Sequence, residues 1–208
     1  EIIMTNKVAI TAEMMDKLPK LEYISVMATG YNIVDVEAAK ARNIVVSNAA
    51  GYSTSAVVQQ TMAFILELFS NTALPSTSVK EDNKWATQAD FSYTLGPIHE
   101  LKNKVLGIIG FGTIGQQVAL VAKAFGMRIL ANKRNMDTEP PSGIKWASLN
   151  ELLEKADVVS LHCPQTQETT GMVNRDFLTK MKKGAYLVNT ARGGLIKEQD
   201  LANALNKG

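Results

Sequence analysis

Three glycines near the middle of the chain, Gly110, Gly112 and Gly115, have the spacing that lets a backbone approach a phosphate group closely. Residues 105–109 before them form an apolar run typical of a buried strand, and residues 113–125 after them have a helical pattern. Gly110 allows a tight turn, Gly112 presents no side chain to the phosphates, and Gly115 allows close packing of helix on strand. The start of a helix also offers free N–H groups to negative charge. We therefore predict that a dinucleotide pyrophosphate binds at Gly110, Gly112, Thr113, Ile114 and Gly115. The alternative is a plain strand–helix turn without a ligand.

The composition is that of an ordinary globular protein and excludes several classes. Hydrophobic residues make up 46% and charged residues 20% of the 208 residues, which suits one large domain or two small ones. A net charge of +2 favours neither nucleic acid nor a membrane as partner. No apolar run approaches the roughly 18 residues of a membrane span, and the first ten residues lack a signal-peptide pattern. The single cysteine, Cys163, excludes an intrachain disulfide framework and favours a cytoplasmic location.

The elements that must position these residues alternate along the chain, which is typical of a parallel α/β sheet. In the first part of the chain, the residue pattern predicts a strand within 1–10, a helix at 11–19 with Thr11 as N-cap, a strand at 21–28, a helix at 34–41 and a strand at 44–47. The turn-rich stretch 48–55 is a predicted crossing between domains.

A second alternating series follows. A broad apolar face predicts a helix at 56–69, whereas 74–104 has no clear period. We expect Trp85, Phe91 and Tyr93 to hold this aperiodic segment against the surface beneath it. Beyond it we predict strands at 105–109, 128–131, 144–146, 157–161 and 185–189, and helices at 113–125, 150–155, 174–181 and 197–206, the last closed by Gly208. These are five strands of a six-stranded, doubly wound, Rossmann-type parallel sheet, and the fold class is α/β.

Four blocks of sequence carry a resemblance to a known family. They are ATGYNIVDVEAAKARNIVVSNAAG, GFGTIG, VVSLHCPQTQETTGMVN and GAYLVNTARGGLIKEQDLANAL. With these blocks the chain resembles the D-isomer-specific 2-hydroxyacid dehydrogenases over nearly its whole length. The stretches WATQADFSY and GPIHELKNKVLGIIGFG resemble the glycerate dehydrogenase (hydroxypyruvate reductase) branch of that family.

The resemblance implies two domains. Residues 1–52 would be part of a smaller, flavodoxin-like α/β substrate domain, and residues 53–208 an NAD(P)-binding Rossmann domain that lacks its last strand. It also implies that the chain is truncated at both ends, with the family's catalytic Glu and His beyond Gly208. By analogy with the family we expect a homodimer.

The activity that the resemblance implies is hydride transfer between NAD(P)H and a short 2-oxo acid or D-2-hydroxy acid, with hydroxypyruvate or glyoxylate favoured. A small-molecule substrate is therefore expected, and no metal. The alternative is a non-catalytic, dinucleotide-sensing co-regulator built on the same fold. The presence of Arg192 and the ordinary surface composition favour the enzyme.

Arg192 is the candidate catalytic and substrate-binding residue. It follows the predicted strand 185–189, at the carboxyl end where open α/β sheets bind ligands. A guanidinium can hold a 2-oxo acid through paired hydrogen bonds and stabilise charge on its oxygen, whereas the alternative is an ordinary surface ion pair. The family match places its substrate-binding arginine here and lines the nicotinamide pocket with Asn189, Thr190 and Ala191.

Thr29 and Gly30 end a strand of the other domain. The resemblance implies that backbone N–H groups of this loop hold the substrate carboxylate, and Gly30 suits a close approach. An ordinary strand-ending turn is the alternative.

Neither histidine is a candidate for proton transfer. His162 matches an H-x-P element of the family beside the adenosine half of the cofactor, which implies a wall of the site, with Cys163 and Pro164 near the adenine ribose. No base is evident beside Cys163, which disfavours a nucleophilic role. His99 lies in a predicted loop before the glycine strand and is expected at the surface.

Basic residues occupy the position that decides between NAD and NADP. An NAD site places an acidic residue about 20 residues beyond the glycine turn, to accept hydrogen bonds from the ribose. This chain has Asn132, Lys133 and Arg134 there, so we predict a preference for NADP, with NAD bound through backbone groups as the alternative. Thr169 or Thr170 would either contact the phosphates or cap the following helix.

Overall fold

The structure is a computed structural model that describes residues 1–207. By their internal contacts the residues form two compact units, Glu1–Thr54 and Ser55–Gly208. Each unit is an α/β layer structure with its own parallel sheet. The predicted closure of the last helix by Gly208 lies outside the described residues, and the functional assignment of the two units stays a prediction.

The first unit is a three-stranded parallel sheet in the order β1–β2–β3. Its elements are β1 (Ile2–Thr5), α1 (Ala12–Asp16), β2 (Tyr23–Val26), α2 (Val36–Ala41) and β3 (Val45–Asn48). Thr11 is confirmed as the N-cap of α1, because its hydroxyl accepts a hydrogen bond from the Met14 amide. The helix ends at Asp16, earlier than predicted. Ile24 and Val26 of the central strand are almost fully buried in the small core of this unit.

The second unit contains a five-stranded parallel sheet in the order β6–β5–β4–β7–β8. Its elements are α3 (Thr54–Ser70), α4 (Ala73–Lys80), α5 (Lys84–Thr87), β4 (Val105–Ile109), α6 (Thr113–Ala124), β5 (Arg128–Asn132), β6 (Ile144–Trp146), α7 (Leu149–Lys155), β7 (Val158–Leu161), α8 (Arg175–Lys180), β8 (Tyr186–Asn189), a 3-10 turn at Gly193–Leu195 and α9 (Glu198–Leu205). Every predicted strand and helix of this unit is present. The five parallel strands and their order confirm the Rossmann-type sheet.

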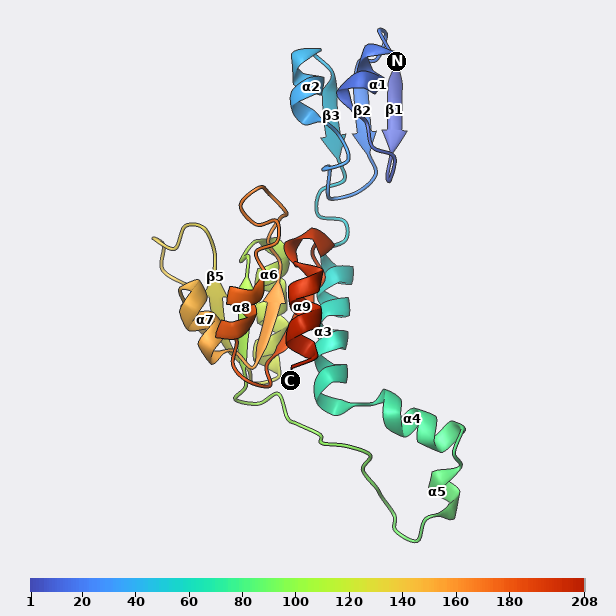
Figure 1. Cartoon of the computed structure of the whole chain (residues 1–208), viewed down its shortest axis with the longest axis vertical. Coiled ribbons are helices and arrows are strands. Elements are labelled where there is room, and N and C mark those ends of the chain that lie inside the picture. The colour runs from blue at the N-terminus through green and yellow to red at the C-terminus, as the bar shows by residue number, and fades with distance from the viewer. Residues whose placement is uncertain (208) are drawn as a thin grey trace. The chain divides into compact units, whose positions relative to one another are not determined.

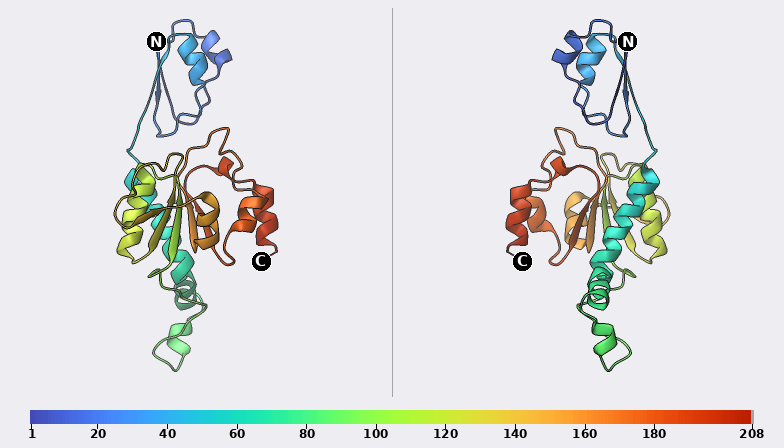
Figure 2. Two further views of the ribbon diagram at one scale, coloured as in Figure 1. Left: turned by 90° about the vertical axis from the view of Figure 1, so that its left-hand side faces the viewer. Right: turned by 90° about the vertical axis from the view of Figure 1, so that its right-hand side faces the viewer.

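Strand β4 runs through the middle of this unit and is buried at all five positions. Leu106 and Ile108 point into one apolar cluster, with α3 and α6, and Val105 and Ile109 point into another, with α7 and α8. This alternation is the period of two expected for a strand covered on both faces. Figure 2 shows the two helical layers on either side of the sheet. Burying each such side chain stabilises the fold by roughly 1.5–3 kcal/mol.

The order of the strands fixes where a ligand can bind. The chain leaves β4 toward β5 on one side and continues to β7 on the other, so the direction of winding reverses beside β4. Ligands of open α/β sheets bind outside the carboxyl ends of the strands at such a switch point. The glycine turn, the end of β5 and the end of β7 all lie at this edge.

Residues 71–99 form an arm that leaves the sheet unit and returns to the same place. The Asn71 side chain donates to Pro97 O (3.0 Å), and the His99 amide donates to Phe69 O (2.9 Å), which closes the base of the arm. Helices α4 and α5 form its outer part (Figure 1).

The prediction that aromatic residues hold this segment on a surface beneath is wrong. Phe91 is 91% exposed and Trp85 is 56% exposed. Trp85 packs instead against Tyr93, with ring centroids 6.2 Å apart. Helix α4 was missed because Pro75 suggests a break, although proline is tolerated in the first turn of a helix.

Candidate functional site

The turn after β4 requires glycine at Gly110 for two reasons. Its φ of +95° is in the left-handed region, and a Cβ there would lie 2.5 Å from the backbone nitrogen of Cys163. The Gly110 amide donates to Asn132 O (2.9 Å), which ties the turn to the end of β5. The turn is therefore held between the chain segments that follow β5 and β7.

Gly112 is the N-cap of α6, and it leaves the start of this helix open. No side chain caps the helix, so its first-turn N–H groups are available to a ligand. The residue is exposed, and a Cβ built on it would meet no atom within 4 Å. The absence of a side chain here thus leaves space in front of the helix, which fits a pyrophosphate at the positive end of the helix dipole.

Gly115 has a different role, because a side chain there would overlap the backbone. A Cβ would collide with the carbonyl oxygen of Gly110 and lie 3.2 Å from Ile108 Cγ2. Close packing of α6 on the turn and on β4 therefore depends on this glycine. The three glycines allow the turn, the open space and the packing that the sequence predicts for them.

Basic side chains follow β5 beside the glycine turn. Lys133 Nζ lies 4.5 Å from the ring centroid of Trp146 and donates to Thr138 Oγ1 at 3.1 Å. The same indole packs edge-on against Phe111 of the glycine turn, with centroids 5.2 Å apart. Lys133 is thereby held near the turn.

Two neighbours of Lys133 make further polar contacts at this edge. The Asn132 side chain donates to Ala147 O (2.9 Å), so it braces the end of the sheet. Arg134 forms an exposed ion pair with Glu168, with Nη2 and Oε2 2.9 Å apart.

His162 follows β7 and forms a neutral wall of this edge. Its amide donates to Ile109 O (2.7 Å), and its Nε2 shares a hydrogen bond with Ser160 Oγ (2.9 Å). Burial lowers the pKa of the imidazole to about 4. The ring is therefore uncharged at neutral pH, which suits packing against a nucleoside better than transfer of a proton.

Burial raises the pKa of the Cys163 thiol, whose Sγ lies 3.9 Å from Met172 Sδ. A protonated thiol is a weak nucleophile, which agrees with the low expectation for a nucleophilic cysteine. Pro164 is exposed, and the threonine hydroxyls of the loop that follows it form hydrogen bonds within that loop. Thr169 Oγ1 donates to Pro164 O (2.7 Å).

Neither Thr169 nor Thr170 caps the next helix. The N-cap of α8 is Asn174, whose side chain accepts from the Phe177 amide (3.1 Å). The capping interpretation is therefore wrong, and contact with phosphates stays a prediction.

The residues after β8 form an ordered loop that presents Arg192. Asn189 Oδ1 accepts from the Ala191 amide (3.0 Å), while its Nδ2 donates to Arg192 O (2.9 Å). Thr190 shares a 2.8 Å hydrogen bond with the fully buried Thr61 of α3. The exposed Arg192 guanidinium donates to Ala191 O, and within residues 1–207 no carboxylate pairs with it. The surface ion pair considered as an alternative is absent from the described residues.

Thr29 and Gly30 lie in the loop after β2 of the first unit. Asn48 Nδ2 donates to Thr29 O (2.8 Å), and the Thr29 hydroxyl shares a 3.2 Å hydrogen bond with Ser53 Oγ. The adjacent strand ends enclose a hollow of about 290 Å³ lined by Ser25, Val26, Met27, Ser47, Asn48, Ala49 and Tyr52. The hollow supplies polar groups beside the predicted carboxylate loop.

Three residues of the site were not found from the sequence. Phe111 and Trp146 pack together beside the turn, and Glu168 reaches Arg134 from a loop distant in sequence. Only the order of the strands brings these segments to one edge, so the sequence offered no direct signal for them.

A larger hollow, of about 970 Å³, lies at the opposite edge, where β4, β5 and β6 begin. It is lined by Lys123, Arg128, Lys145, Lys155 and Lys182 among others, but several of these lysines are already bonded to Glu151, Asp157 or a carbonyl. In the described part of the chain, no three or more His, Cys, Asp or Glu side chains gather to hold a metal ion. No helix of residues 1–207 is long and apolar enough to cross a membrane.

The sheet order, the glycine turn and the open start of α6 define a Rossmann-like dinucleotide-binding α/β protein. Residues 62–208 match the family described as "D-isomer specific 2-hydroxyacid dehydrogenase, NAD binding domain", and the chain belongs to this family.

Named relatives agree with this family. The chain is 40% identical to a hydroxypyruvate reductase of Blautia hydrogenotrophica over 100% of its own length and 65% of that relative's. A D-lactate dehydrogenase from Aquifex aeolicus, solved with NAD and lactic acid, has a TM-score of 0.88 at 33% identity, with 100% of this chain and 61% of that chain covered. An acyclic imino acid reductase in complex with NADPH and D-Arg has a TM-score of 0.87 at 32% identity, with coverage of 100% and 65%. The chain thus spans somewhat less than two thirds of the relatives it matches.

Proposed function

We propose that the protein is an NAD(P)-dependent oxidoreductase that interconverts a short 2-oxo acid and a D-2-hydroxy acid. The observation that carries the proposal is the side-chain-free space at Gly112 in front of the uncapped α6. Family membership and the hydroxypyruvate reductase among the relatives support hydroxypyruvate as the favoured substrate, with glyoxylate next.

Each group at the carboxyl edge has a role in this proposal. The α6 amides and the glycine turn hold the pyrophosphate, and His162, Cys163 and Pro164 flank the adenosine. The nicotinamide supplies or accepts the hydride when bound. Residues 189–191 shape its pocket, because Asn189 fixes the loop at both ends.

Arg192 binds the substrate in this proposal. Its guanidinium is exposed and has no carboxylate partner among residues 1–207, so it is available to the 2-oxo acid. Two charge-assisted hydrogen bonds would orient the acid and stabilise charge that develops on the carbonyl oxygen. The amides at Thr29 and Gly30 are assigned to the substrate carboxylate. Proton transfer is assigned to neither His99 nor His162.

The cofactor preference rests on Lys133 and Arg134. Both are cations at the position where an NAD site carries a carboxylate, and Lys133 is kept beside the turn by Trp146. We propose that the pair favours NADP(H). The similar solved structures include one with NAD and one with NADPH.

We further propose a homodimer and a cytoplasmic location. The arm at residues 71–99 exposes apolar side chains that a second copy could cover: Leu74, Val79, Trp85, Phe91 and Ile98. A half-buried, unpaired Cys163 suits a reducing compartment.

The test combines binding and turnover. Calorimetry on the 208-residue chain should show 1:1 binding of NADPH, and tighter binding than of NADH. The full-length protein should oxidise NADPH in the presence of hydroxypyruvate, and the reaction is measured as the loss of reduced-nicotinamide absorbance. Binding without turnover of hydroxypyruvate, glyoxylate, pyruvate or phosphohydroxypyruvate would favour the co-regulator. Equal affinities for NADPH and NADH would contradict the NADP preference alone.

A further inference from the structure

The Arg134–Glu168 ion pair joins two loops on opposite sides of the glycine turn. β5 and β7 both pair with β4, and Asn132 and Leu161 are the register partners of Ile109. The loops that contain Arg134 and Glu168 therefore leave the sheet at the same level, one on each side of the turn. The 2.9 Å contact between Nη2 and Oε2 spans the end of β4, where the adenosine is proposed to lie.

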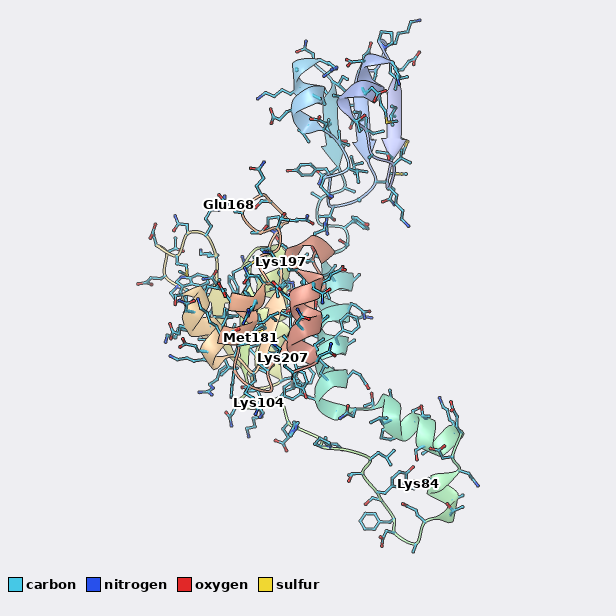
Figure 3. All side chains as sticks on the ribbon, viewed as in Figure 1. Lys84, Lys104, Glu168, Met181, Lys197 and Lys207 are labelled. Carbon is cyan, nitrogen blue, oxygen red and sulfur yellow. The ribbon has the colours of Figure 1, made fainter. Side chains whose placement is uncertain are left out.

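Glu168 is presented by a loop with internal hydrogen bonds. The Thr170 hydroxyl donates to Thr166 O (2.7 Å), and the Thr170 amide donates to the same oxygen (2.9 Å). Thr169 is fixed in turn by Pro164 O. Figure 3 shows Glu168 at the outer end of this loop, at the opposite edge from Lys104, which precedes β4. These hydrogen bonds fix the loop that carries Glu168 at the carboxyl edge of the sheet.

The chemistry of the pair distinguishes two kinds of dinucleotide. Its side chains are 81% and 77% exposed, so the ion pair opens at little cost. A ribose phosphate would compete with Glu168 for the Arg134 guanidinium and would be repelled by the carboxylate. A ribose with free hydroxyls carries no charge, so it is not repelled by Glu168 and does not compete with it in this way for Arg134.

We propose that Glu168 is a specificity-determining residue, which competes with a ribose phosphate for Arg134 and weakens binding of the phosphorylated dinucleotide. The inference rests on the proposed function, because it requires adenosine at this edge. It assigns to Glu168 a role opposite to that of Lys133 and Arg134. The cofactor preference of the protein is then a balance between two cations and one nearby anion.

The test uses adenosine fragments and direct binding, so that turnover is not needed. Calorimetry on the full-length protein compares 2′,5′-ADP with 5′-AMP for wild type, Glu168→Gln and Glu168→Asp. The glutamine variant should bind 2′,5′-ADP about fivefold more tightly, the scale of one exposed ion pair, and 5′-AMP within about twofold of wild type. The aspartate variant should stay near wild type. Raising the salt concentration should reduce the difference.

Two further variants make the result specific. Glu100→Gln removes an exposed carboxylate that lies before β4 and forms no ion pair within residues 1–207, so it should change neither affinity. In an Arg134→Gln background, Glu168→Gln should lose most of its effect, because the competition is for that guanidinium. If Glu168→Gln changes the affinity for both fragments equally, or leaves the affinity for 2′,5′-ADP unchanged, the proposed role of Glu168 is overturned but the proposed coenzyme site is not. Failure of wild type to bind either fragment would overturn the proposed coenzyme site as well.

Discussion

Replacing Gly112 by alanine should weaken dinucleotide binding while leaving the fold unchanged. The backbone at Gly112 has φ −83° and ψ −162°, which alanine adopts without strain. The added methyl group meets no protein atom within 4 Å. It points instead into the space that the pyrophosphate is proposed to occupy.

The expected magnitudes follow from these contacts. A surface substitution of this kind changes the free energy of unfolding by about 0.5 kcal/mol or less. In the complex, the methyl group would displace the phosphate from at least one amide of α6. Because a hydrogen bond to a charged group is worth about 1.5–3 kcal/mol, the Kd for NADPH should rise about 10- to 100-fold.

Gly110→Ala is the matched control from the same motif. Its φ of +95° and the 2.5 Å distance from a Cβ to Cys163 N predict a loss of about 2–5 kcal/mol in unfolding free energy. Thermal melts and calorimetric titrations of both variants give the two readouts. If the Gly112→Ala protein has the melting temperature of wild type and binds NADPH as tightly as wild type, the proposed position of the pyrophosphate is refuted.

Three further outcomes are expected. Folding lowers the pKa of His162 to about 4, so the stability tied to its neutral ring is present above about pH 6.5 and is lost as the pH falls. Between pH 7 and pH 5 the free energy of unfolding, measured by urea titration, should fall by roughly 2 kcal/mol more in wild type than in His162→Gln. Parallel pH profiles for the two proteins would contradict this. Arg192→Gln in the full-length protein should lower kcat/KM for hydroxypyruvate about 100- to 1000-fold with the Kd for NADPH unchanged, whereas an unchanged kcat/KM would remove Arg192 from the site. Phe91→Ser should shift sedimentation toward the monomer, since a 91% exposed phenylalanine on the arm is assigned to the dimer contact, and an unaltered dimer would exclude that assignment.

Local pattern was sufficient to predict the Rossmann-type unit. Strand β4 is apolar at four of its five positions, and the glycine turn and α6 follow it directly. The N-cap of α1 was also predictable, because a threonine at Thr11 precedes a helical pattern. In these places local sequence and tertiary packing favour the same conformation.

The arm and the ion pair across the turn could not be predicted in this way. Whether Trp85 and Phe91 are covered depends on what lies beneath them, and the periodicity of a short polar segment does not report it. Glu168 and Arg134 are 34 residues apart and meet only because β5 and β7 both flank β4. Such contacts follow from the order of the strands, which is a property of the whole sheet.

The most direct test of the proposed coenzyme site is a titration of the ¹⁵N-labelled 208-residue chain with NADPH, followed through its amide resonances. We expect the largest shifts at Gly112, Thr113 and Ile114, where the open start of α6 offers its N–H groups to the pyrophosphate. Shifts confined to the hollow at the amino ends of β4, β5 and β6, with those three amides unmoved, would contradict the account.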